Sequence, residues 1–462
     1  MVSYNWCRLR RYAGMEDAHL DSSRKQPQNN VAARPWIAVF DLNVTGNSPA
    51  GSCVLAEVLG LADEFDITVF SDAFDGGAAG LERSGCGAHQ QKRCDDMPGN
   101  GGAGRVRWVR VPLPAKPGFL RYMVFSLLAP GMLRKHIAAR GAPPILLQAT
   151  QGQFPGADIC YAHFCHRAYL KQQWQSQNAR GLRRLVRWIT HRYNAETERR
   201  SFLKASLVVA PSRGLAKVLA ETYPFLENRI LTIPNPVDAA SFARPEGFDR
   251  NPLLAQLGLP VGARVLCFAA LGNFSHKGLG ILLEALAGID DRAVRLMVVG
   301  GNAGEIAEFS VLARNLGVSH RVVFTGFQRD IRPYLWAADL FVLPSLCETF
   351  ALVVMQAMAA GVPAVVTRLH GVEDYAVHGE NAWFVERNPD AVRVAISGVL
   401  RDKKHLQAAG VAASQAALRF DRAHFVETWR KCMRLAIKQK SATGTLAPLP
   451  TVRFTAQTER TW

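Results

Sequence analysis

The sequence predicts an α/β protein built on doubly wound parallel sheets. The first observation is a regular alternation between residues 265 and 343, where short apolar strand candidates and longer helix candidates follow one another. The second is the apolar stretch 340–366, which is typical of a strand, a helix and a further strand. Gly361 and Pro363 mark the end of that helix, which we expect to begin shortly after the turn at Pro344.

Shorter strand candidates in the first half predict a second sheet. They lie at 37–41, 67–70, 106–111, 145–148, 158–161, 207–210 and 230–233. We therefore expect two α/β domains. The predicted organisation is an N-terminal extension over 1–34, a first domain over 35–235 with a Gly-rich insertion at 74–105, a linker over 236–261, a second domain over 262–420, a C-terminal helix over 421–440 and a flexible tail over 441–462.

The composition of the chain indicates which class of partner it binds and in which cellular compartment it works. Lys and Arg number 55 against 38 Asp and Glu, which gives the 462-residue chain a formal net charge of +17. This basicity indicates an anionic partner, and we rank a membrane surface above nucleic acid because no nucleic-acid recognition motif is present. The nine cysteines form no CxxC or zinc pattern, and no run of 18 apolar residues occurs. We expect a cytosolic protein with no signal peptide.

The helix predicted after Pro344 carries two polar residues of interest. Glu348 lies at its start and Gln356 eight residues later, about 12 Å away at the helical rise of ~1.5 Å per residue. Free N–H groups at a helix start bind a diphosphate well, so the span suits a nucleotide-sugar. The alternative is a Glu that caps the helix dipole and a solvated Gln.

Loops after neighbouring strands of the second sheet should meet at one edge, where ligands of such sheets bind. Lys277 is a natural counter-charge for a diphosphate leaving group, and Gln328 or Arg329 could hold a base edge. Further candidates on this edge are Asn273, His276 and Gly301.

The first half holds weaker signals. His163 and His166 follow a strand and could bond a ligand, although a lone histidine is more often structural. Gly51 lies in a turn that could approach a phosphate or could be an ordinary strand–helix turn. The segments 116–140 and 180–200 mix Arg with aliphatic and aromatic residues, which favours either contact with an anionic membrane or core helices with basic ends.

Taken together, the motifs of residues 205–400 resemble the nucleotide-binding domain of GT-B glycosyltransferases, in particular the retaining family 4. The segments that carry the resemblance are Asn235–Asp238, His276–Leu279, Val299–Gly301, Val323–Gly326, Ala338–Ser345, Glu348–Pro363, Gly371–Asp374 and Gly379–Asn381. The resemblance implies two Rossmann-like domains facing across a cleft, with the acceptor held by the first. Within this family, the chain most resembles enzymes of lipopolysaccharide-core and exopolysaccharide synthesis.

The resemblance also implies roles for individual residues. Glu348 should contact the donor sugar, Lys277 the diphosphate, and Gln328 and Arg329 the surroundings of the base, while His163 or His166 should lie near the reacting sugar. Backbone amides of the next segment should bind the diphosphate. They belong to Thr349, Phe350, Ala351 and Leu352. Transfer in this family normally needs no metal and no other cofactor.

The sequence departs from the family pattern at three places. Gln356 stands where the family has a second Glu, the family's Arg before the Lys loop is replaced by Asn273 or His276, and Asn47-Ser48-Pro49 replaces a Gly-Gly phosphate loop. We therefore predict a glycosyltransferase that uses a UDP- or GDP-sugar and a glycan or lipid-linked acceptor, acting at the inner face of the cell membrane. The rivals are a sugar-nucleotide epimerase, a non-catalytic nucleotide-sugar-binding protein and a nucleic-acid binder.

Overall fold

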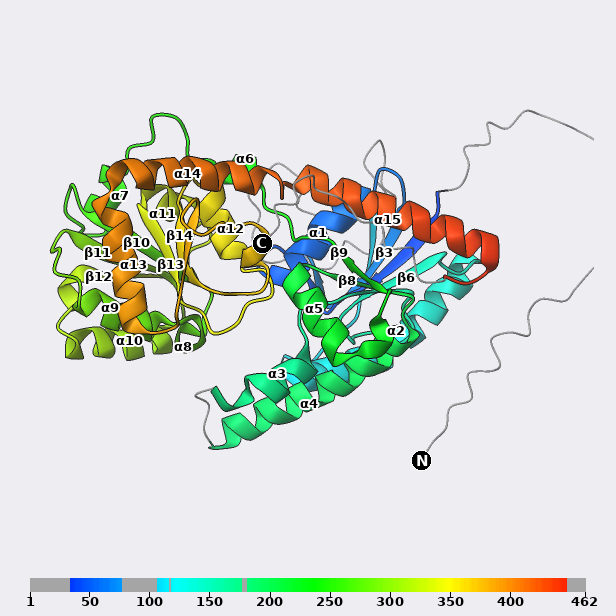
Figure 1. Cartoon of the computed structure of the whole chain (residues 1–462). Coiled ribbons are helices and arrows are strands. Elements are labelled where there is room, and N and C mark those ends of the chain that lie inside the picture. Colours follow the sequence, from blue (N-terminus) through cyan, green and yellow to red (C-terminus); the bar gives the residue numbers. More distant parts are fainter. Residues whose placement is uncertain (1–33, 77–105, 116–117, 177–180, 447–462) are drawn as a thin grey trace, which may run out of the picture. The chain divides into compact units, whose positions relative to one another are not determined.

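The computed structural model describes residues 34–76, 106–115, 118–176 and 181–446, and shows two separate parallel sheets (Figure 1). In spatial order the first sheet consists of β5 (Val106–Arg110), β3 (Asp66–Ser71), β1 (Trp36–Phe40), β6 (Leu146–Thr150), β7 (Ile159–Tyr161), β8 (Leu207–Ala210) and β9 (Ile230–Thr232). All of its neighbouring strands pair in parallel. Two short strands pair in parallel as a separate small sheet. They are β2 (Asn43–Val44), which follows β1 in the sequence, and β4 (Ala73–Phe74), which follows β3.

Both faces of the first sheet are covered, which is why its central strands are continuous apolar runs. Successive side chains of β1 alternate between two cores: Ile37 and Val39 enter one, and Ala38 and Phe40 the other. The first core is closed by α1 (Pro49–Leu61) and α15 (Arg422–Thr443). The helices that bury side chains in the second core are α2 (Gly118–Arg140), α3 (His166–Gln172), α4 (Gly181–Lys204) and α5 (Arg213–Thr222).

The second sheet is also wholly parallel. Its strands, in spatial order, are β12 (Val322–Gly326), β11 (Val294–Gly300), β10 (Arg264–Ala270), β13 (Leu340–Leu343), β14 (Ala364–Thr367) and β15 (Ala382–Val385). The α-helices that follow β10 in this domain are α8 (Phe274–Lys277), α9 (Leu279–Ala287), α10 (Ala303–Asn315), α11 (Arg332–Ala337), α12 (Leu352–Ala359), α13 (Pro389–Arg401) and α14 (Lys403–Leu418). The prediction of two doubly wound parallel sheets is confirmed.

The segment 236–261, predicted as a linker, is instead part of the second domain. It forms α6 (Ala239–Phe242) and α7 (Asn251–Gln256), and Val237, Leu254 and Leu259 are buried in the second domain's core. These apolar residues gain more from burial than an open linker would allow. Helix α14 was not predicted, because its Ala-rich sequence has no distinct apolar stripe.

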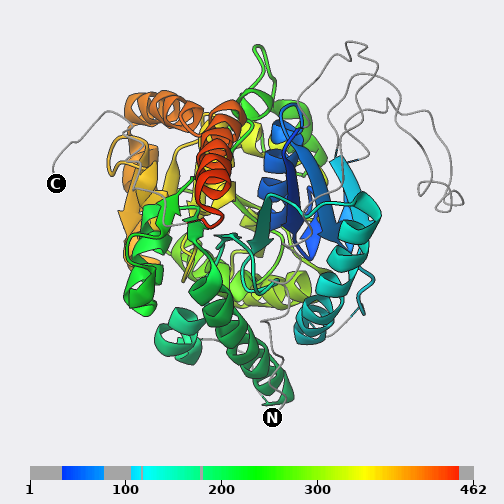
Figure 2. The ribbon, with the colours of Figure 1, turned by 90° about the vertical axis from the view of Figure 1, so that its right-hand side faces the viewer.

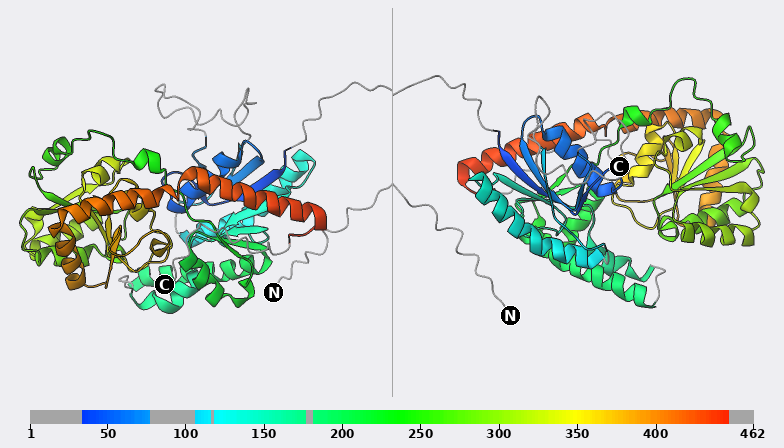
Figure 3. Two further views of the ribbon diagram at one scale, coloured as in Figure 1. Left: turned by 45° about the horizontal axis from the view of Figure 1, so that its top comes forward. Right: turned by 180° about the vertical axis from the view of Figure 1, so that it is seen from behind.

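The C-terminal helix α15 packs along α1 of the first domain, as the views in Figure 3 show. Phe425, Trp429 and Met433 enter the first domain's core, and Arg430 bonds to Asp63 and Glu64. The helix runs three residues beyond the predicted end at 440, and Leu446 is buried against the same core. The predicted extension up to residue 33, the insertion from 77 to 105 and the tail from 447 lie outside the described residues.

Candidate donor site on the second sheet

An ion pair lies at the carboxyl edge of the second sheet. Lys277 Nζ donates to Glu348 Oε1 at 2.5 Å, and Ser345 Oγ donates to the same oxygen at 2.9 Å. Thr367 Oγ1 holds the carbonyl of Ser345 at 2.6 Å. The ends of β13 and β14 and the Lys277 loop thus fix one carboxylate, which still keeps a second oxygen for a ligand. The structure brings together the two residues that the sequence ranked highest.

The Lys277 loop reaches Glu348 because its backbone takes two left-handed residues. Asn273 has φ +58° and Gly278 φ +84°, and they bracket the four-residue α8. A Cβ at position 278 would lie 2.1 Å from the carbonyl oxygen of Pro344, so only glycine allows this contact. His276 completes the join: its Nε2 lies 3.3 Å from the carbonyl oxygen of Cys347, and burial lowers its pKa. His276 therefore supports the loop, and its burial disfavours the charged form.

The predicted start of the helix after Pro344 is wrong. Helix α12 begins at Leu352, four residues after Glu348, so the 12 Å helical spacing between Glu348 and Gln356 does not apply. The intervening segment turns through Ala351, whose φ is +52°. Within the described residues, the amide groups of residues 349–352 donate no hydrogen bond. Gln356 is half-buried on α12, and its side chain bonds to no described residue.

The remaining donor-side candidates are placed as follows. Gly301 has φ +80°, and a Cβ there would lie 2.3 Å from the ring of Phe274, which gives this glycine a packing role. Gln328 Nε2 donates to the carbonyl of Thr325 at 2.8 Å, and Arg329 is exposed beside it. Both follow β12, the outermost strand on that side of the sheet.

Arg387 joins the two loops of this site, and no sequence motif indicated it. Its guanidinium donates from Nε to the carbonyl of Pro344 at 3.2 Å and from Nη2 to the carbonyl of Ser275 at 3.4 Å. Burial of the guanidinium lowers its pKa. Arg387 thus ties the Glu348 loop to the Lys277 loop and adds a second cation near Lys277. It follows β15, outside every motif, so no sequence signal pointed to it.

Polar side chains at the carboxyl edge of the first sheet lack partners. His163 Nε2 is buried without a hydrogen bond, and burial lowers the pKa of this histidine to about 3. Three further buried oxygens at the ends of neighbouring strands make no direct hydrogen bond to a described group, although the Thr150 hydroxyl lies close enough to Asp41 to offset part of the rise that burial causes in the pKa of that carboxyl. They are Asp41 Oδ2, Thr150 Oγ1 and Gln151 Oε1. Each such atom costs about 1–3 kcal/mol unless something bonds to it, so this edge is a candidate binding surface.

The two histidines predicted at this edge, His163 and His166, have different environments in the structure. Nδ1 of His166 lies 3.0 Å from Nδ1 of His191 on α4, and burial lowers the pKa values of the pair to about 3 and 4. The backbone N–H of His166 also donates to the buried carboxyl of Glu198. His166 is therefore committed to packing, whereas His163 retains a free ring nitrogen.

Gly51 also has a structural explanation. A Cβ at this position would lie 2.0 Å from the carbonyl oxygen of Asn43, so the glycine allows α1 to approach the loop after β1. Ser48 caps α1 by accepting from the N–H of Gly51 at 3.3 Å. These contacts favour an ordinary strand–helix turn.

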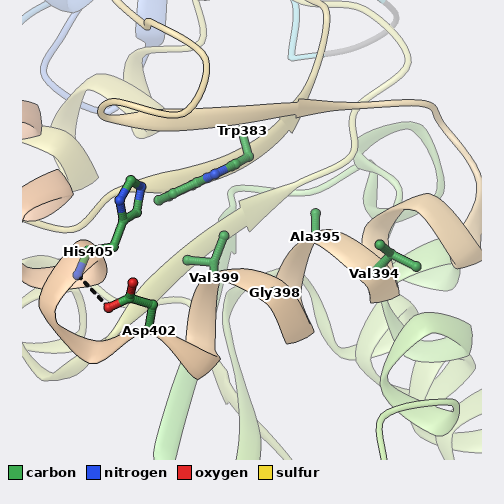
Figure 4. A pocket seen from close by; sticks show the side chains of 7 residues that line it. All are labelled: Trp383, Val394, Ala395, Gly398, Val399, Asp402 and His405. Atoms are coloured by element: carbon green, nitrogen blue, oxygen red, sulfur yellow. Dashed lines mark hydrogen bonds between the residues drawn. The ribbon is translucent and has the colours of Figure 1, made fainter.

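A further pocket, of about 310 Å³, lies away from these residues between β15, α13 and α14 (Figure 4). Trp383 and His405 face each other across it, and Asp402 caps α14 at its floor. It contains no predicted donor residue. Among the described residues no group of three or more His, Cys, Asp or Glu side chains is arranged to hold a metal. None of the described helices is both long and apolar enough to cross a membrane.

Comparison with known proteins places this geometry in a family. Residues 262–402 match the model of Glycosyl transferases group 1, and residues 51–241 match that of Glycosyltransferase Family 4. D-inositol 3-phosphate glycosyltransferase of Corynebacterium diphtheriae is 35% identical over 179 residues, 36% of this chain and 40% of the relative. The lipopolysaccharide core biosynthesis glycosyltransferase LpsE of Rhizobium meliloti is 37% identical over 133 residues, 29% of this chain and 38% of the relative.

Each match to these two curated relatives spans 40% of the relative's length or less. Among solved structures, WaaG, a glycosyltransferase involved in lipopolysaccharide biosynthesis, aligns with a TM-score of 0.66 at 18% identity over 86% of this chain and 99% of that chain. This likeness confirms the GT-B fold. With family 4 and group 1 domains on its two sheets, the chain belongs to the GT-B glycosyltransferases.

Proposed function

We propose that the protein transfers a sugar from a nucleoside-diphosphate-sugar to a glycan or lipid-linked acceptor, with retention of anomeric configuration. The observation that carries the proposal is the Lys277–Glu348 pair beside the unpartnered amides of residues 349–352. Glu348 would bond the sugar hydroxyls. The amides and Lys277 would bind the diphosphate and stabilise its negative charge as the sugar departs.

The first domain would supply the acceptor side. The unpartnered polar atoms around His163 are suited to sugar hydroxyls, which both donate and accept hydrogen bonds. A neutral His163 could either donate to or accept from a hydroxyl near the reacting carbon. The residues that would bind the diphosphate include two cations, Lys277 and Arg387, which supports transfer without a metal ion.

The test is donor binding followed by turnover. UDP-, GDP- and ADP-linked sugars are screened by thermal shift in the presence of EDTA, and any stabilising donor is assayed for transfer to a panel of glycan and lipid-linked acceptors. We expect one base class to stabilise the protein and to support transfer. If no donor stabilises the folded protein, the proposal fails. Donor binding without transfer to any acceptor would instead favour the non-catalytic nucleotide-sugar-binding alternative.

We also propose that an anionic membrane is the partner of the basic helices. In the first half of α4, residues 181, 182 and 184–193 are exposed or half-buried, and Figure 2 shows this half extending beyond the rest of the domain. Its exposed side chains combine apolar groups with arginines: Leu182, Leu185, Trp188, Ile189, Arg184 and Arg187. Helix α2 lies against α4 (Figure 3) and exposes Met123, Leu127 and Leu128 near Arg134 and Lys135. Apolar groups framed by cations suit the headgroup region at the inner face of a cell membrane.

Sedimentation with vesicles tests this partner. The wild type should bind phosphatidylglycerol vesicles, bind phosphatidylcholine vesicles much less, and be released by salt. The double variant Leu182→Glu/Leu185→Glu should lose binding. Leu418→Glu, a change at another exposed leucine, is the control. Equal sedimentation of the double variant and wild type would contradict the assignment, and preferential binding to RNA or DNA would favour the nucleic-acid alternative.

A further inference from the structure

Three consecutive carbonyl groups in the segment before α12 are held by hydroxyl groups. Ser212 Oγ donates to the carbonyl oxygen of Thr349 at 2.7 Å. The hydroxyl of Tyr375 lies 3.0 Å from the carbonyl oxygen of Phe350 and 3.2 Å from that of Ala351. All of these contacts are buried or partly buried, so water competes with them weakly.

Holding a carbonyl also fixes the direction of the next amide. In a trans peptide unit the C=O and the following N–H point in opposite directions. With the carbonyls of residues 349–351 turned toward Ser212 and Tyr375, the N–H groups of Phe350, Ala351 and Leu352 are turned away from them. Successive amides in such a turn form a concave anion-binding surface.

The conformation is not one that the segment would adopt alone. Ala351 has φ +52°, a left-handed conformation that costs an L-residue about 1–2 kcal/mol. Gly371 lets the Tyr375 segment press on this turn, since a Cβ there would lie 2.4 Å from the Cα of Phe350. The ring of Tyr375 is buried near Phe350 and Phe420, with ring centroids 5.5 and 5.9 Å away. The hydroxyl is therefore held in place by a packed ring.

Ser212 belongs to the first domain and has two bonds to make. Its Oγ accepts from the N–H of Leu215, which caps α5, while its own proton goes to Thr349. The next residue, Arg213, donates from its backbone N–H and from Nε to the two oxygens of Asp374, each at 2.9 Å. The start of α5 thus contacts the second domain both at the turn before α12 and next to Tyr375.

We propose that Tyr375 and Ser212 are positioning residues that aim the amides of Phe350, Ala351 and Leu352 at the diphosphate of the donor. This inference rests on the proposed function, because it assigns how the donor's anionic part is recognised. Neither residue touches the donor itself. Because Ser212 comes from the first domain, it also makes binding of the diphosphate depend on the contact between α5 and the turn before α12.

The decisive variant is Tyr375→Phe, which removes the hydroxyl and keeps the packed ring. Binding is measured by calorimetry for UDP, GDP and ADP and for the matching nucleosides. We expect Tyr375→Phe to lower the affinity for the preferred nucleoside diphosphate about tenfold, which is the contribution of one good hydrogen bond. The affinity for the matching nucleoside should be unchanged. In turnover the loss should appear in KM for the donor and in kcat, because the diphosphate is also the leaving group. Tyr334→Phe, whose hydroxyl bonds to no described residue, is the matched control.

Ser212→Ala tests the second anchor, and Asn388→Ala is its control. Both changes remove the cap of a helix, α5 or α13, so both should lower stability similarly. Only Ser212→Ala should lower the affinity for the nucleoside diphosphate more than the affinity for the nucleoside. A wild type that binds none of the three diphosphates would overturn the proposed function. A wild type that binds one of them, with Tyr375→Phe and Ser212→Ala unchanged or equally weakened for nucleoside and diphosphate, would overturn the positioning role alone.

Discussion

The carboxyl edges of the two sheets differ in which groups lack hydrogen-bond partners and are therefore available to a ligand. On the second sheet Lys277, Ser345 and Glu348 are bonded to one another, and the backbone amides of residues 349–352 have no partner among the described residues. On the first sheet the atoms without a direct partner belong to side chains at the ends of several strands: Asp41 after β1, Thr150 and Gln151 at β6, and His163 after β7. One edge offers a fixed backbone cradle, and the other offers separate side chains.

Under the proposed function, the difference between the two edges follows from the ligand that each would bind. A diphosphate is the same in every nucleotide-sugar, so main-chain groups and one ion pair can recognise it in any member of the family. An acceptor varies, and the side chains that meet it vary with it. The second edge therefore has a motif, and the first edge has none.

The largest effect is expected at the ion pair of the second edge. Glu348→Ala removes the carboxylate that Lys277 and Ser345 hold, and should lower kcat/KM for the donor by about a hundredfold or more. Glu348→Gln keeps the bond from Ser345 and should lose less. Steady-state kinetics with the donor from the binding screen would measure both. Activity of Glu348→Ala within a few-fold of wild type would remove this carboxylate from the site.

A buried carboxyl beneath the first edge should dominate the response of stability to pH. Burial raises the pKa of Glu57 from its ordinary value of 4.5 to about 8, while Gln148 donates to it at 3.0 Å. The folded protein therefore keeps a proton that the unfolded chain releases above about pH 4.5, so this group costs stability as pH rises toward 8. Glu57→Gln should match wild type near pH 4.5 and gain several degrees in Tm, roughly, by pH 8.

Thermal melts from pH 4.5 to 8.5 would follow the gain, with the exposed Glu284→Gln as control. The expected result is a difference in Tm between Glu57→Gln and wild type that grows with pH, and no such trend for Glu284→Gln. A difference that stays constant across the range would show that Glu57 ionises in the folded protein as it does in the unfolded chain.

The sequence predicted the strands of the first sheet and most elements of the second within a few residues, as at β1, β13 and α9, while β15 and α14 were not predicted. The candidate site was easier to predict on the second sheet, for a physical reason. Lys277 and Glu348 could be placed on one edge in advance because they follow neighbouring strands, β10 and β13, but their ion pair was not predicted. The turn at Ala351 could not be predicted, because an alanine in the left-handed region is held there by Tyr375 and Ser212, which lie far away in sequence.

The site residues that were missed depend on tertiary contacts in the same way. Arg387 and Tyr375 lie in loops of the second domain with no motif around them, and His191 lies within a basic helix that gave no sign of a pair with His166. In each case the decisive neighbour is more than 20 residues away, and periodicity carries no information on such pairs.

On the first edge, His163 should act without titrating. His163→Phe keeps a ring against Tyr161, 4.1 Å away, and removes the nitrogen, so kcat/KM should fall about tenfold. Because burial lowers the pKa of His163 to about 3, the histidine stays neutral above about pH 4. The ratio of wild-type to variant activity should therefore be constant from about pH 5.5 to 8.5. A ratio that falls with an apparent pKa near 6.5, the ordinary value for His, would place His163 in water instead.

The smallest effect is expected at Gln356, where the second edge departs from its own family. Its half-buried amide bonds to no described residue, so it is available to a ribose hydroxyl. Gln356→Glu would make that bond charge-assisted and should tighten donor binding by about fivefold, close to 1 kcal/mol. Calorimetry with the preferred nucleoside and its 2′,3′-dideoxy analogue would check it, since only the hydroxylated ligand can gain. If the variant binds the nucleoside no more tightly than wild type, or gains equally for the dideoxy analogue, residue 356 does not contact the ribose hydroxyls.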